Sequence, residues 1–472
     1  MNHGFDMKGL HRLFNSIAVA ALLMNGCSTT STNTSTTNSS QQTGPSFVTG
    51  TDSPMASVLS FAVQIESINA TDANGKTVSL LSGTPTVDFA RLNGLETLLD
   101  MNDVPAGTYG NVSITLGAAT IGYLQTQTGS APAIATKPAT YPASASTYTF
   151  QASLATPIVV AQSGSPAGLH VDFELGKSIG VDTNGNITGA VTPTFNMNGV
   201  VINDAGAYLD WFDAAVVSVN ANNQSFVVQG PHGRQFTVNV NGQTEWENNE
   251  ALTDLTTSSI VTLSGALDRD DATIDADDVA ILSQNGFYAG GQVTYVTPAI
   301  GPAASFNLYV RGLLPTTTGL TLGQIATINL TGNENYFIYW FHNPLTEFVF
   351  NQSLPLPGQH VSVGGPATGA ANASNVTVKR VVLRDWGFNT SVAANSVSTT
   401  DGSFQVTVNG FAGTLIPQAV TVYTAGKTVF RGGLNGVSDL AGGANVRVVG
   451  LLLENPLNGK TVLLARYVDE FN

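Results

Sequence analysis

Short runs in which apolar and polar residues alternate recur along most of the chain, and they predict β-strands. Residues 59–65, 112–116 and 404–408 are clear examples. Side chains on a strand point to opposite faces in turn, so this alternation places one face of each strand on a core. The hairpin turns that we expect between strands are at Asn74-Gly75, Asn184-Gly185, Asn241-Gly242 and Asp401-Gly402. Only residues 89–101 carry leucines at helical spacing, so the pattern predicts an all-β protein with one weak helix there.

The region 50–203 contains an ordered set of short motifs. They are Thr51-Asp52-Ser53-Pro54, Val104-Pro105-Ala106-Gly107-Thr108-Tyr109 and Val171-Asp172-Phe173-Glu174. This order resembles the bacterial lipoprotein family called domain of unknown function 4382, with Val104 in place of Leu and Glu174 in place of a second Asp. The resemblance implies a β-sandwich of prealbumin type and an exported protein. It brings no assigned activity and no catalytic residues.

The remainder of the chain shows an internal repeat, with units at 208–285, 286–386 and 387–472. Early in each unit a strand opens with a Ser-Phe pair, at Ser225, Ser305 and Ser403. A later alternating strand has a glycine near its end, and an apolar strand closes the unit. These units are similar to the small β-barrels called domain of unknown function 5666. The expected fold is therefore an N-terminal prealbumin-like β-sandwich followed by three small β-barrel repeats in tandem.

The N-terminal residues predict export. A basic start and an apolar run over 13–24 are typical of a signal peptide covering 1–26, with Met1 or Met7 as the first residue. The run ends at Gly26-Cys27, which resembles the lipobox of bacterial lipoproteins, and Cys27 is the only cysteine in the chain. We expect lipidation at Cys27, with plain secretion as the alternative. Residues 27–49 are expected to form a flexible Ser/Thr/Asn linker. The resemblance to lipoproteins implies the outer membrane, on its periplasmic side or at the cell surface, because Ser28 rather than Asp follows the cysteine.

Charge narrows the class of partner. Charged residues make up 10% of the chain and the net charge is −15, with 17 basic residues scattered along it. Such a chain has no basic patch with which to follow a phosphate backbone, which excludes nucleic acid as a partner. The expected partners are a membrane reached through the lipid, and an envelope protein or a polysaccharide. No cofactor is expected.

An acidic stretch is the first candidate site, and its weak calcium ligands are Asp268, Asp270, Asp275 and Asp277. An EF-hand loop starting at Asp268 fails, because Ala272 offers no side-chain oxygen and Thr273 stands where glycine is needed. We interpret the stretch as a solvated acidic loop, with a non-standard Ca²⁺ site as the alternative. The alternating residues His170, Asp172 and Glu174 are likewise interpreted as the polar outer face of a strand rather than as metal ligands.

The densest aromatic run covers residues 336–342. Alternation places Tyr336, Trp340 and His342 on one face of the expected strand. This face is the candidate ligand-binding surface, for stacking on sugars or on a partner. The alternative is a strand buried on both sides.

The sequence contains none of the local motifs of nucleophilic, metallohydrolase or phosphate-loop catalysis. We therefore expect a non-enzymatic cell-envelope lipoprotein with a structural or interaction role. The alternatives are a carbohydrate- or polymer-binding surface protein and a glycoside-active enzyme.

Overall fold

A computed structural model describes residues 42–52, 55, 57–92, 97–125, 131–162, 166–183, 186–201, 208–230, 234–267, 273–314, 318–338, 350–408 and 419–470. Strands dominate these residues, and the α-helix found in them, α1 (Leu175–Ser178), is one turn long. The predicted all-β fold is confirmed. Short 3-10 turns are η1 (Phe89–Arg91), η2 (Pro142–Ser144), η4 (Ala221–Asn223), η6 (Glu247–Asn249), η7 (Leu252–Asp254), η8 (Ala367–Ala370) and η9 (Val437–Asp439).

The helix predicted over residues 89–101 is wrong. Phe89–Arg91 form the single 3-10 turn η1, and Thr97–Pro105 form strand β5. Leu98 and Leu99 are both buried, but Leu98 packs into the cluster of the first barrel and Leu99 into the core of the sandwich. Neighbouring leucines that face two different cores require the two-residue period of a strand, which here overrides helical propensity.

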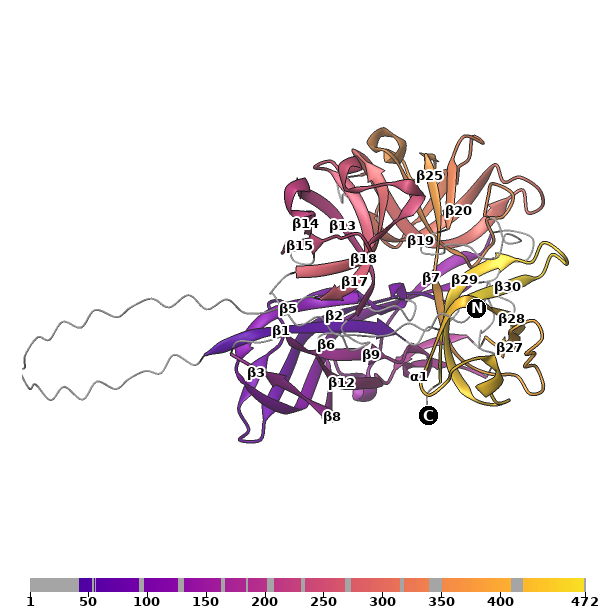
Figure 1. Ribbon diagram of the computed structural model, residues 1–472. Helices are drawn as coiled ribbons and strands as arrows, with labels where there is room; N and C mark the ends of the chain where they lie inside the picture. The colour runs from indigo at the N-terminus through magenta and orange to yellow at the C-terminus, as the bar shows by residue number, and fades with distance from the viewer. Residues whose placement is uncertain are drawn as a thin grey trace, which may run out of the picture. The chain divides into compact units, whose positions relative to one another are not determined.

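The N-terminal part is a sandwich of two sheets (Figure 1). Its strands are β1 (Thr43–Asp52), β2 (Val58–Asp72), β3 (Thr77–Ser79), β4 (Thr86–Asp88), β5 (Thr97–Pro105), β6 (Gly107–Gln125), β7 (Ala133–Pro138), β8 (Tyr148–Val160), β9 (Ala167–Phe173), β10 (Ile179–Val181), β11 (Ile187–Val191) and β12 (Phe195–Val201). One sheet has the order β12-β9-β1-β5, and the other has the order β3-β2-β6-β7 with β4 on β2 and β8 on β6. β10 and β11 pair with each other as a separate two-stranded sheet. Both sheets contribute to one core, in which the Phe61 and Phe89 rings each lie 5.0 Å from the Phe173 ring.

Residues 43–49, which composition placed in the flexible linker, form most of strand β1 instead. The strand lies between β5 and β9 and pairs with both, so its backbone groups are satisfied within the sheet. Phe47 and Val48 are fully buried. Two apolar side chains on opposite faces are enough to hold this polar segment in the fold, which composition alone did not reveal.

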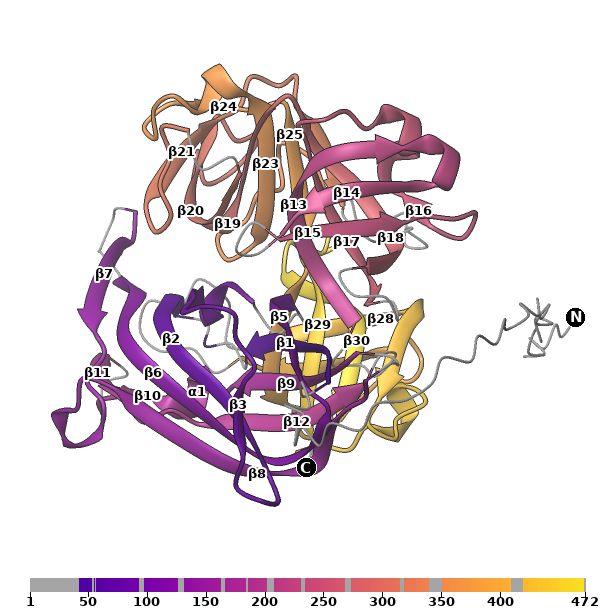
Figure 2. The same cartoon turned by 90° about the vertical axis from the view of Figure 1, so that its left-hand side faces the viewer.

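Three further sheets follow along the chain (Figure 2). The first contains β13 (Tyr208–Asn220), β14 (Ser225–Gln229), β15 (Gln235–Asn239), β16 (Glu245–Trp246), β17 (Ser259–Leu267) and β18 (Thr273–Gln284). The second contains β19 (Gly286–Thr297), β20 (Ser305–Leu314), β21 (Ile325–Asn329), β22 (Asn335–Ile338), β23 (His360–Pro366), β24 (Val376–Thr377) and β25 (Arg380–Arg384). The third contains β26 (Trp386–Ser391), β27 (Ser403–Thr407), β28 (Ala419–Arg431), β29 (Asn445–Glu454) and β30 (Thr461–Glu470).

The three sheets share one topology. In the first, a parallel pairing of β15 with β18 closes the ring β13-β14-β15-β18-β17. In the third, a bridge between Val392 and Val406 joins the two ends of the order β26-β29-β30-β28-β27. In the second, β24 pairs with β21 in parallel and β25 pairs with β23. Together β24 and β25 occupy the position that β18 has in the first barrel. Closure in this way leaves few exposed strand edges.

The repeated sequence features occupy equivalent places. Ser225, Ser305 and Ser403 are the first residues of β14, β20 and β27. The repeated glycines Gly265 and Gly450 each lie at a register shift between the last two long strands of their barrel. A Cβ atom at Gly265 would lie 2.2 Å from the Asp275 carbonyl oxygen, and one at Gly450 would lie 2.1 Å from that of Leu464. Glycine is needed there because the backbones approach too closely for a side chain.

Residues 41–472 form one compact unit, and hydrophobic clusters link its parts. Phe47, Leu98 and Met101 of the sandwich pack into the core of the first barrel. Ile260 and Leu282 of the first barrel form a small cluster with Tyr288 and Val382 of the second. The residue limits that the sequence assigned to the domains stay predictions. In the part of the chain that the structure describes, no helix is long and apolar enough to cross a bilayer.

Candidate functional site

Most of the predicted site residues fall outside the described ranges. These are the lipidation residue Cys27, the aromatic-face residues Trp340 and His342, and the acidic residues Asp268 and Asp270. The remaining ones are Tyr336, Asp275 and Asp277.

Tyr336 lies in β22 and is half-buried. Its ring packs edge-on against Phe350 at 5.7 Å between centroids, and it belongs to the margin of the second barrel's core. Burial, helped by the charge of Glu334, raises the pKa of its phenol. These contacts place Tyr336 at the edge of a core, and the aromatic binding face stays a prediction.

Asp275 and Asp277 are exposed on alternate positions of β18. The Asn239 amide donates a hydrogen bond to Asp275 at 3.0 Å. Among the described residues, no group of three His, Cys, Asp or Glu side chains could hold a metal ion.

The polar outer face predicted for His170, Asp172 and Glu174 is wrong at its centre. Asp172 is 5% exposed, and its Oδ2 accepts a hydrogen bond from Arg447 Nη2 at 2.8 Å. Arg447 belongs to the third barrel, so this face of β9 is covered by another part of the chain. A partner 275 residues away leaves no trace in local alternation.

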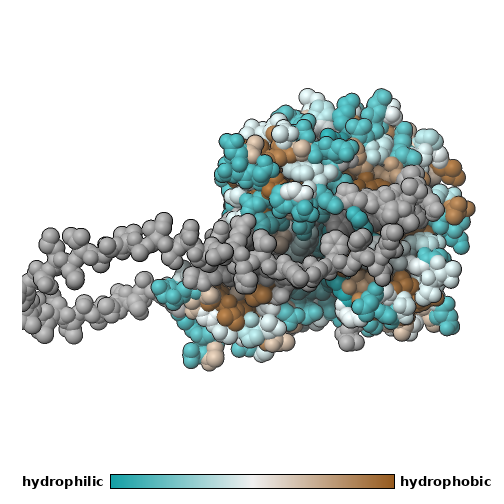
Figure 3. Space-filling model, viewed as in Figure 1, coloured by the Kyte–Doolittle hydropathy of each residue, from teal (hydrophilic) through white to brown (hydrophobic). Residues whose placement is uncertain are grey.

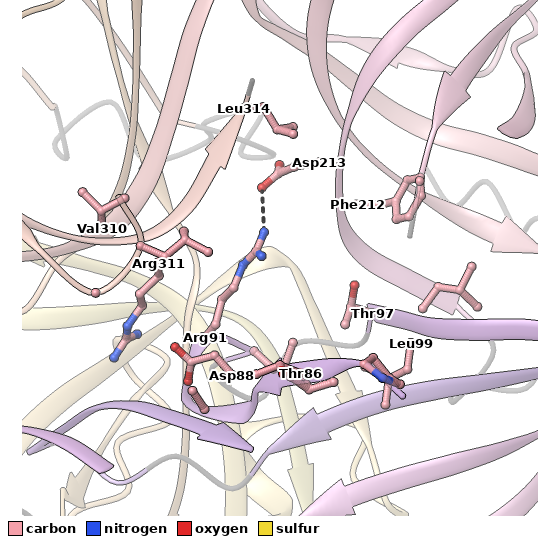
Figure 4. Close-up of a pocket in the computed structure, with 18 of the residues that line it drawn as sticks. Thr86, Asp88, Arg91, Thr97, Leu99, Phe212, Asp213, Val310, Arg311 and Leu314 are labelled. Atoms are coloured by element: carbon pink, nitrogen blue, oxygen red, sulfur yellow. Dashed lines mark ion pairs between the residues drawn. The ribbon is translucent and has the colours of Figure 1, made fainter. Parts of the chain in front are cut away.

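A cavity of ≈ 520 Å³ between three parts of the protein was not foreseen from the sequence (Figure 4). The sandwich contributes β4, η1 and the start of β5, the first barrel contributes β13 and the end of β14, and the second barrel contributes β20. Its wall is largely apolar, with Leu92, Leu99, Phe212, Val310 and Leu314 among its residues. The volume is in the range of small-molecule sites, which run from about 300 to 1,000 Å³.

Asp213 is the best-connected polar group of this cavity. Its Oδ2 accepts a hydrogen bond from the Tyr288 hydroxyl at 2.6 Å and lies 3.8 Å from Arg91 Nη2. Its Oδ1 lies 3.4 Å from Arg384 Nη2. Figure 4 shows Arg91 reaching across the cavity toward Asp213. Two guanidinium groups and a phenol therefore hold this buried carboxylate, as burial of a charge requires.

Asp88 is the second acid of the cavity, and it sits at the base of the sandwich wall. Its Oδ1 accepts a hydrogen bond from the Phe61 N–H at 2.7 Å. Loss of hydration raises the pKa of Asp88 above its ordinary value, although the Arg311 charge, the Phe61 N–H and the Arg91 charge oppose that rise. The carboxyl thus holds its proton to higher pH than a solvated aspartate does.

Arg311 anchors the second barrel to the sandwich. Its Nε donates to the Leu59 carbonyl at 2.6 Å and its Nη2 to the Val58 carbonyl at 3.3 Å. Its guanidinium carbon lies 6.0 Å from the centre of the Trp386 ring. On the other face of this junction, His360 packs edge-on against Trp386, and burial lowers the pKa of His360 well below its usual value, with Arg311 and Arg384 adding to the effect. His360 is therefore a neutral packing group.

The same use of arginine recurs at the other joints. The protein has four β-structures, namely the sandwich and the three barrels. Every described arginine except Arg431 contacts a residue in a β-structure other than its own. The contacts are Arg91 to Asp213, Arg234 to the Met101 carbonyl, Arg311 to the Leu59 carbonyl, Arg380 to Glu250, Arg384 to Asp213, Arg447 to Asp172, and Arg466 to Asp210. By contrast, Lys137 and Lys177 contact residues of their own sandwich. The scarce arginines of this acidic chain are concentrated where its parts meet.

The sequence does mark these arginines. Arg311, Arg384 and Arg466 each follow an apolar residue in a largely apolar strand. A cation on a buried strand needs a partner, which can come from elsewhere in the chain. The signal marks the residue but not its partner.

Two family models match the chain. Residues 47–188 match the model described as Domain of unknown function (DUF4382). Residues 214–280 match the one described as Domain of unknown function (DUF5666).

These matches confirm the resemblances seen in the sequence motifs. The DUF4382 match covers most of the sandwich, and the DUF5666 match covers most of the first barrel. No curated protein matches the chain. Both descriptions leave the activity open, so a function has to be argued from the contacts themselves.

Proposed function

We propose that this chain is a non-enzymatic lipoprotein of the bacterial cell envelope whose four β-domains act together as one interaction body. The observation that carries the proposal is the set of arginine contacts between domains. Freely jointed domains would leave their arginines in solvent. Here the guanidinium groups of Arg311, Arg384 and Arg466 are almost fully buried between domains, at 2–3% residue exposure. Such contacts favour one arrangement of the domains over others.

The polar groups of the cavity support a non-catalytic role. A glycosidase needs two carboxyl groups of different protonation that both address the substrate. Asp213 instead has Arg384 at one oxygen and Tyr288 and Arg91 at the other. A carboxylate held this way is a structural anion, because leaving its cations would cost several kcal/mol.

The surface is consistent with a folded part that is surrounded by water and reaches a membrane only through an anchor. On the face shown in Figure 3, hydrophilic residues predominate and hydrophobic ones occur in small separate patches. Together with the net charge of −15, this surface favours solubility of the folded part. Attachment to a membrane is then the task of the lipid at Cys27, and Ser28 favours the outer membrane.

The test is intact mass and detergent partitioning of the protein from its native host, beside a Cys27→Ala form. We expect the wild type to carry a diacylglycerol adduct at Cys27 and to enter the detergent phase. The Cys27→Ala form should stay in the aqueous phase with the same folded domains. A wild-type protein that lacks the lipid and partitions into water would overturn the anchored part of the proposal.

The interaction part has its own test, namely cross-linking of intact cells followed by purification of the protein. We expect a defined set of envelope components to be cross-linked to the folded part. Glycosidase activity on common glycan substrates, lost on Asp88→Asn, would replace the proposal with the enzymatic alternative.

A further inference from the structure

The cavity between the sandwich and the first two barrels has the properties of a built ligand site. Few polar groups converge on a mostly apolar wall, and they come from three separate parts of the fold. Each wall is held in place by its own core, since Leu99, Phe212 and Val310 are at most 7% exposed. Asp213 and Arg311 are presented on strands β13 and β20, Asp88 at the end of β4, and Arg91 in the turn η1.

The charges of the cavity balance. Its lining includes two arginines, Arg91 and Arg311, and two aspartates, Asp88 and Asp213. A site for an anion or a cation would carry an excess of the opposite charge. Balanced charges instead offer hydrogen-bond donors and acceptors side by side, which suits groups that both donate and accept.

Arg91 is the group best placed to meet a ligand. Its side chain is 39% exposed, whereas that of Asp213 is 1% exposed. The 3.8 Å between Arg91 Nη2 and Asp213 Oδ2 is longer than a direct hydrogen bond. A ligand hydroxyl group beside Arg91 could therefore accept a hydrogen bond from its guanidinium, while the buried Asp213 holds the arginine in place. Gly312 gives the arginine its room, because a Cβ atom there would lie 3.2 Å from Arg91 Nη2.

We infer that the cavity binds a neutral, hydroxyl-rich small molecule of about disaccharide size. Its hydroxyl groups contact Arg91 and the exposed lining residues Thr86 and Gln229, and its C–H faces pack on Leu92, Leu99 and Leu314. Of the aromatic run, the described residues 336–338 do not line this cavity. The inference goes beyond the proposed function and does not require the lipid anchor, so either can fail while the other stands.

Binding is tested on the purified mature protein by saturation-transfer NMR and calorimetry. The probes are the neutral disaccharides cellobiose, maltose and diacetylchitobiose, with cellobiouronic acid and hexanoate as charged comparisons. We expect saturable binding of at least one neutral disaccharide and weaker binding of the two anions. Because the walls belong to three domains, we also expect the bound probe to raise the Tm.

The variants Arg91→Met and Gly312→Ala locate the site. Arg91→Met should weaken binding of the neutral probe at least tenfold by removing the guanidinium. Gly312→Ala should weaken it by a smaller factor, because the guanidinium has to move by only a few tenths of an ångström. Arg431→Met is the matched control, because Arg431 is 38% exposed and lies in the third barrel, so its loss should leave binding unchanged. Equal Tm values without probe show that the variants fold.

Three outcomes overturn the inference. One is that none of the neutral disaccharides binds at a concentration of about 10 mM. Another is that binding survives both Arg91→Met and Gly312→Ala. The third is that an anion binds more tightly than the neutral probes and depends on Arg91, in which case the cavity is an anion site.

Discussion

Two joints of this molecule are built from opposite kinds of residue. In the arginine joint, Arg311 and Tyr309 of the second barrel donate hydrogen bonds to Val58, Leu59 and Ser60 of the sandwich. In the aliphatic joint, four residues of the third barrel pack into the hydrophobic cluster of the second. They are Leu451, Leu453, Val462 and Leu464.

The two joints have different roles: one provides most of the binding energy between domains, and the other sets their relative orientation. Aliphatic burial stabilises in proportion to the area removed from water and depends little on angle. The hydrogen bonds of a guanidinium require donors and acceptors to be aligned, so they favour one orientation. The aliphatic joint therefore holds two barrels together, and the arginine joint fixes how a barrel faces the sandwich.

The largest effect should come from Arg311→Ala. Its loss leaves buried carbonyl groups of the sandwich without donors and opens a cavity at a residue that is 3% exposed, at a cost of about 3–5 kcal/mol. Urea denaturation of the purified protein measures this cost. Arg311→Lys is the informative control, since it keeps the charge but lacks the fork of donors, and it should recover less than half of the loss. A cost below about 1 kcal/mol for the Ala variant would show that the joint contributes little.

Leu464→Ala should rank second. The side chain is 1% exposed, and its truncation should reduce the free energy of unfolding by about 2–4 kcal/mol, as in other buried leucines. Leu457→Ala is the matched control: that leucine is 86% exposed and its truncation should change stability by less than about 0.5 kcal/mol. Equal effects of the two substitutions, measured by the same denaturation, would mean that the aliphatic joint is not closed in solution.

The pair of Arg447 and Asp172 should have a smaller effect. The side chains are 20% and 7% exposed and the pair is 2.8 Å long, so we expect a coupling energy of about 1–2 kcal/mol. A double-mutant cycle with Arg447→Met and Asp172→Asn measures it. The pair Lys177–Glu174 is a surface comparison with Lys177 68% exposed, where about 0.5 kcal/mol or less is expected. An equally large coupling energy for the surface pair would show that the ion pair between domains contributes no more than an ordinary surface pair.

The smallest effect concerns the pH dependence of stability at Asp88. Burial raises its pKa in the folded state above the 3.8 of the unfolded chain, so its ionised form lowers stability above that folded pKa. Asp88→Asn should therefore be more stable than the wild type at pH 7, and the gain should shrink as the pH falls toward about 4. Urea denaturation across this range measures it.

Asp401→Asn gives the opposite sign and serves as the control for Asp88. Hydrogen bonds from Ser398 and Ser403 hold the pKa of Asp401 below its ordinary value. Its ionised form contributes stability above the unfolded pKa, and this contribution is lost as the pH falls. Asp401→Asn should be less stable than the wild type at pH 7. If Asp88→Asn also loses stability at pH 7, the ionised Asp88 is a net stabilising partner of the two arginines.

The sequence predicted features that lie within one barrel and missed the contacts between domains. The Ser-Phe openings at Ser225, Ser305 and Ser403 and the glycines Gly265 and Gly450 follow from strand geometry within one barrel, so they could be read directly. β5 and β1 were misjudged because each buries both of its faces, so neither shows the alternation of apolar and polar residues that marks a strand with one solvent face. The candidate site was missed because the contacts that build it join residues far apart, such as Arg384 and Asp213, 171 positions distant.

The run Leu451-Leu452-Leu453 shows how a shared strand could be recognised. Leu452 faces the core of the third barrel, while its two neighbours face the second. A strand without polar positions is buried on both faces. The closing strand β30 shows the same division, because Leu463 lies in the core of the third barrel and Val462 and Leu464 in that of the second.

The placement of the arginines also bears on how such a chain could be rearranged. The three barrels have one topology, which suggests that one could be deleted, duplicated or exchanged for another. Yet Arg234 of the first, Arg311 of the second and Arg447 of the third each reach a different place on the sandwich. The three repeats therefore share a fold but differ in the contacts that each makes with the sandwich. A shortened or permuted chain would place a cation where its acceptor is missing, so modularity of architecture here does not extend to modularity of assembly.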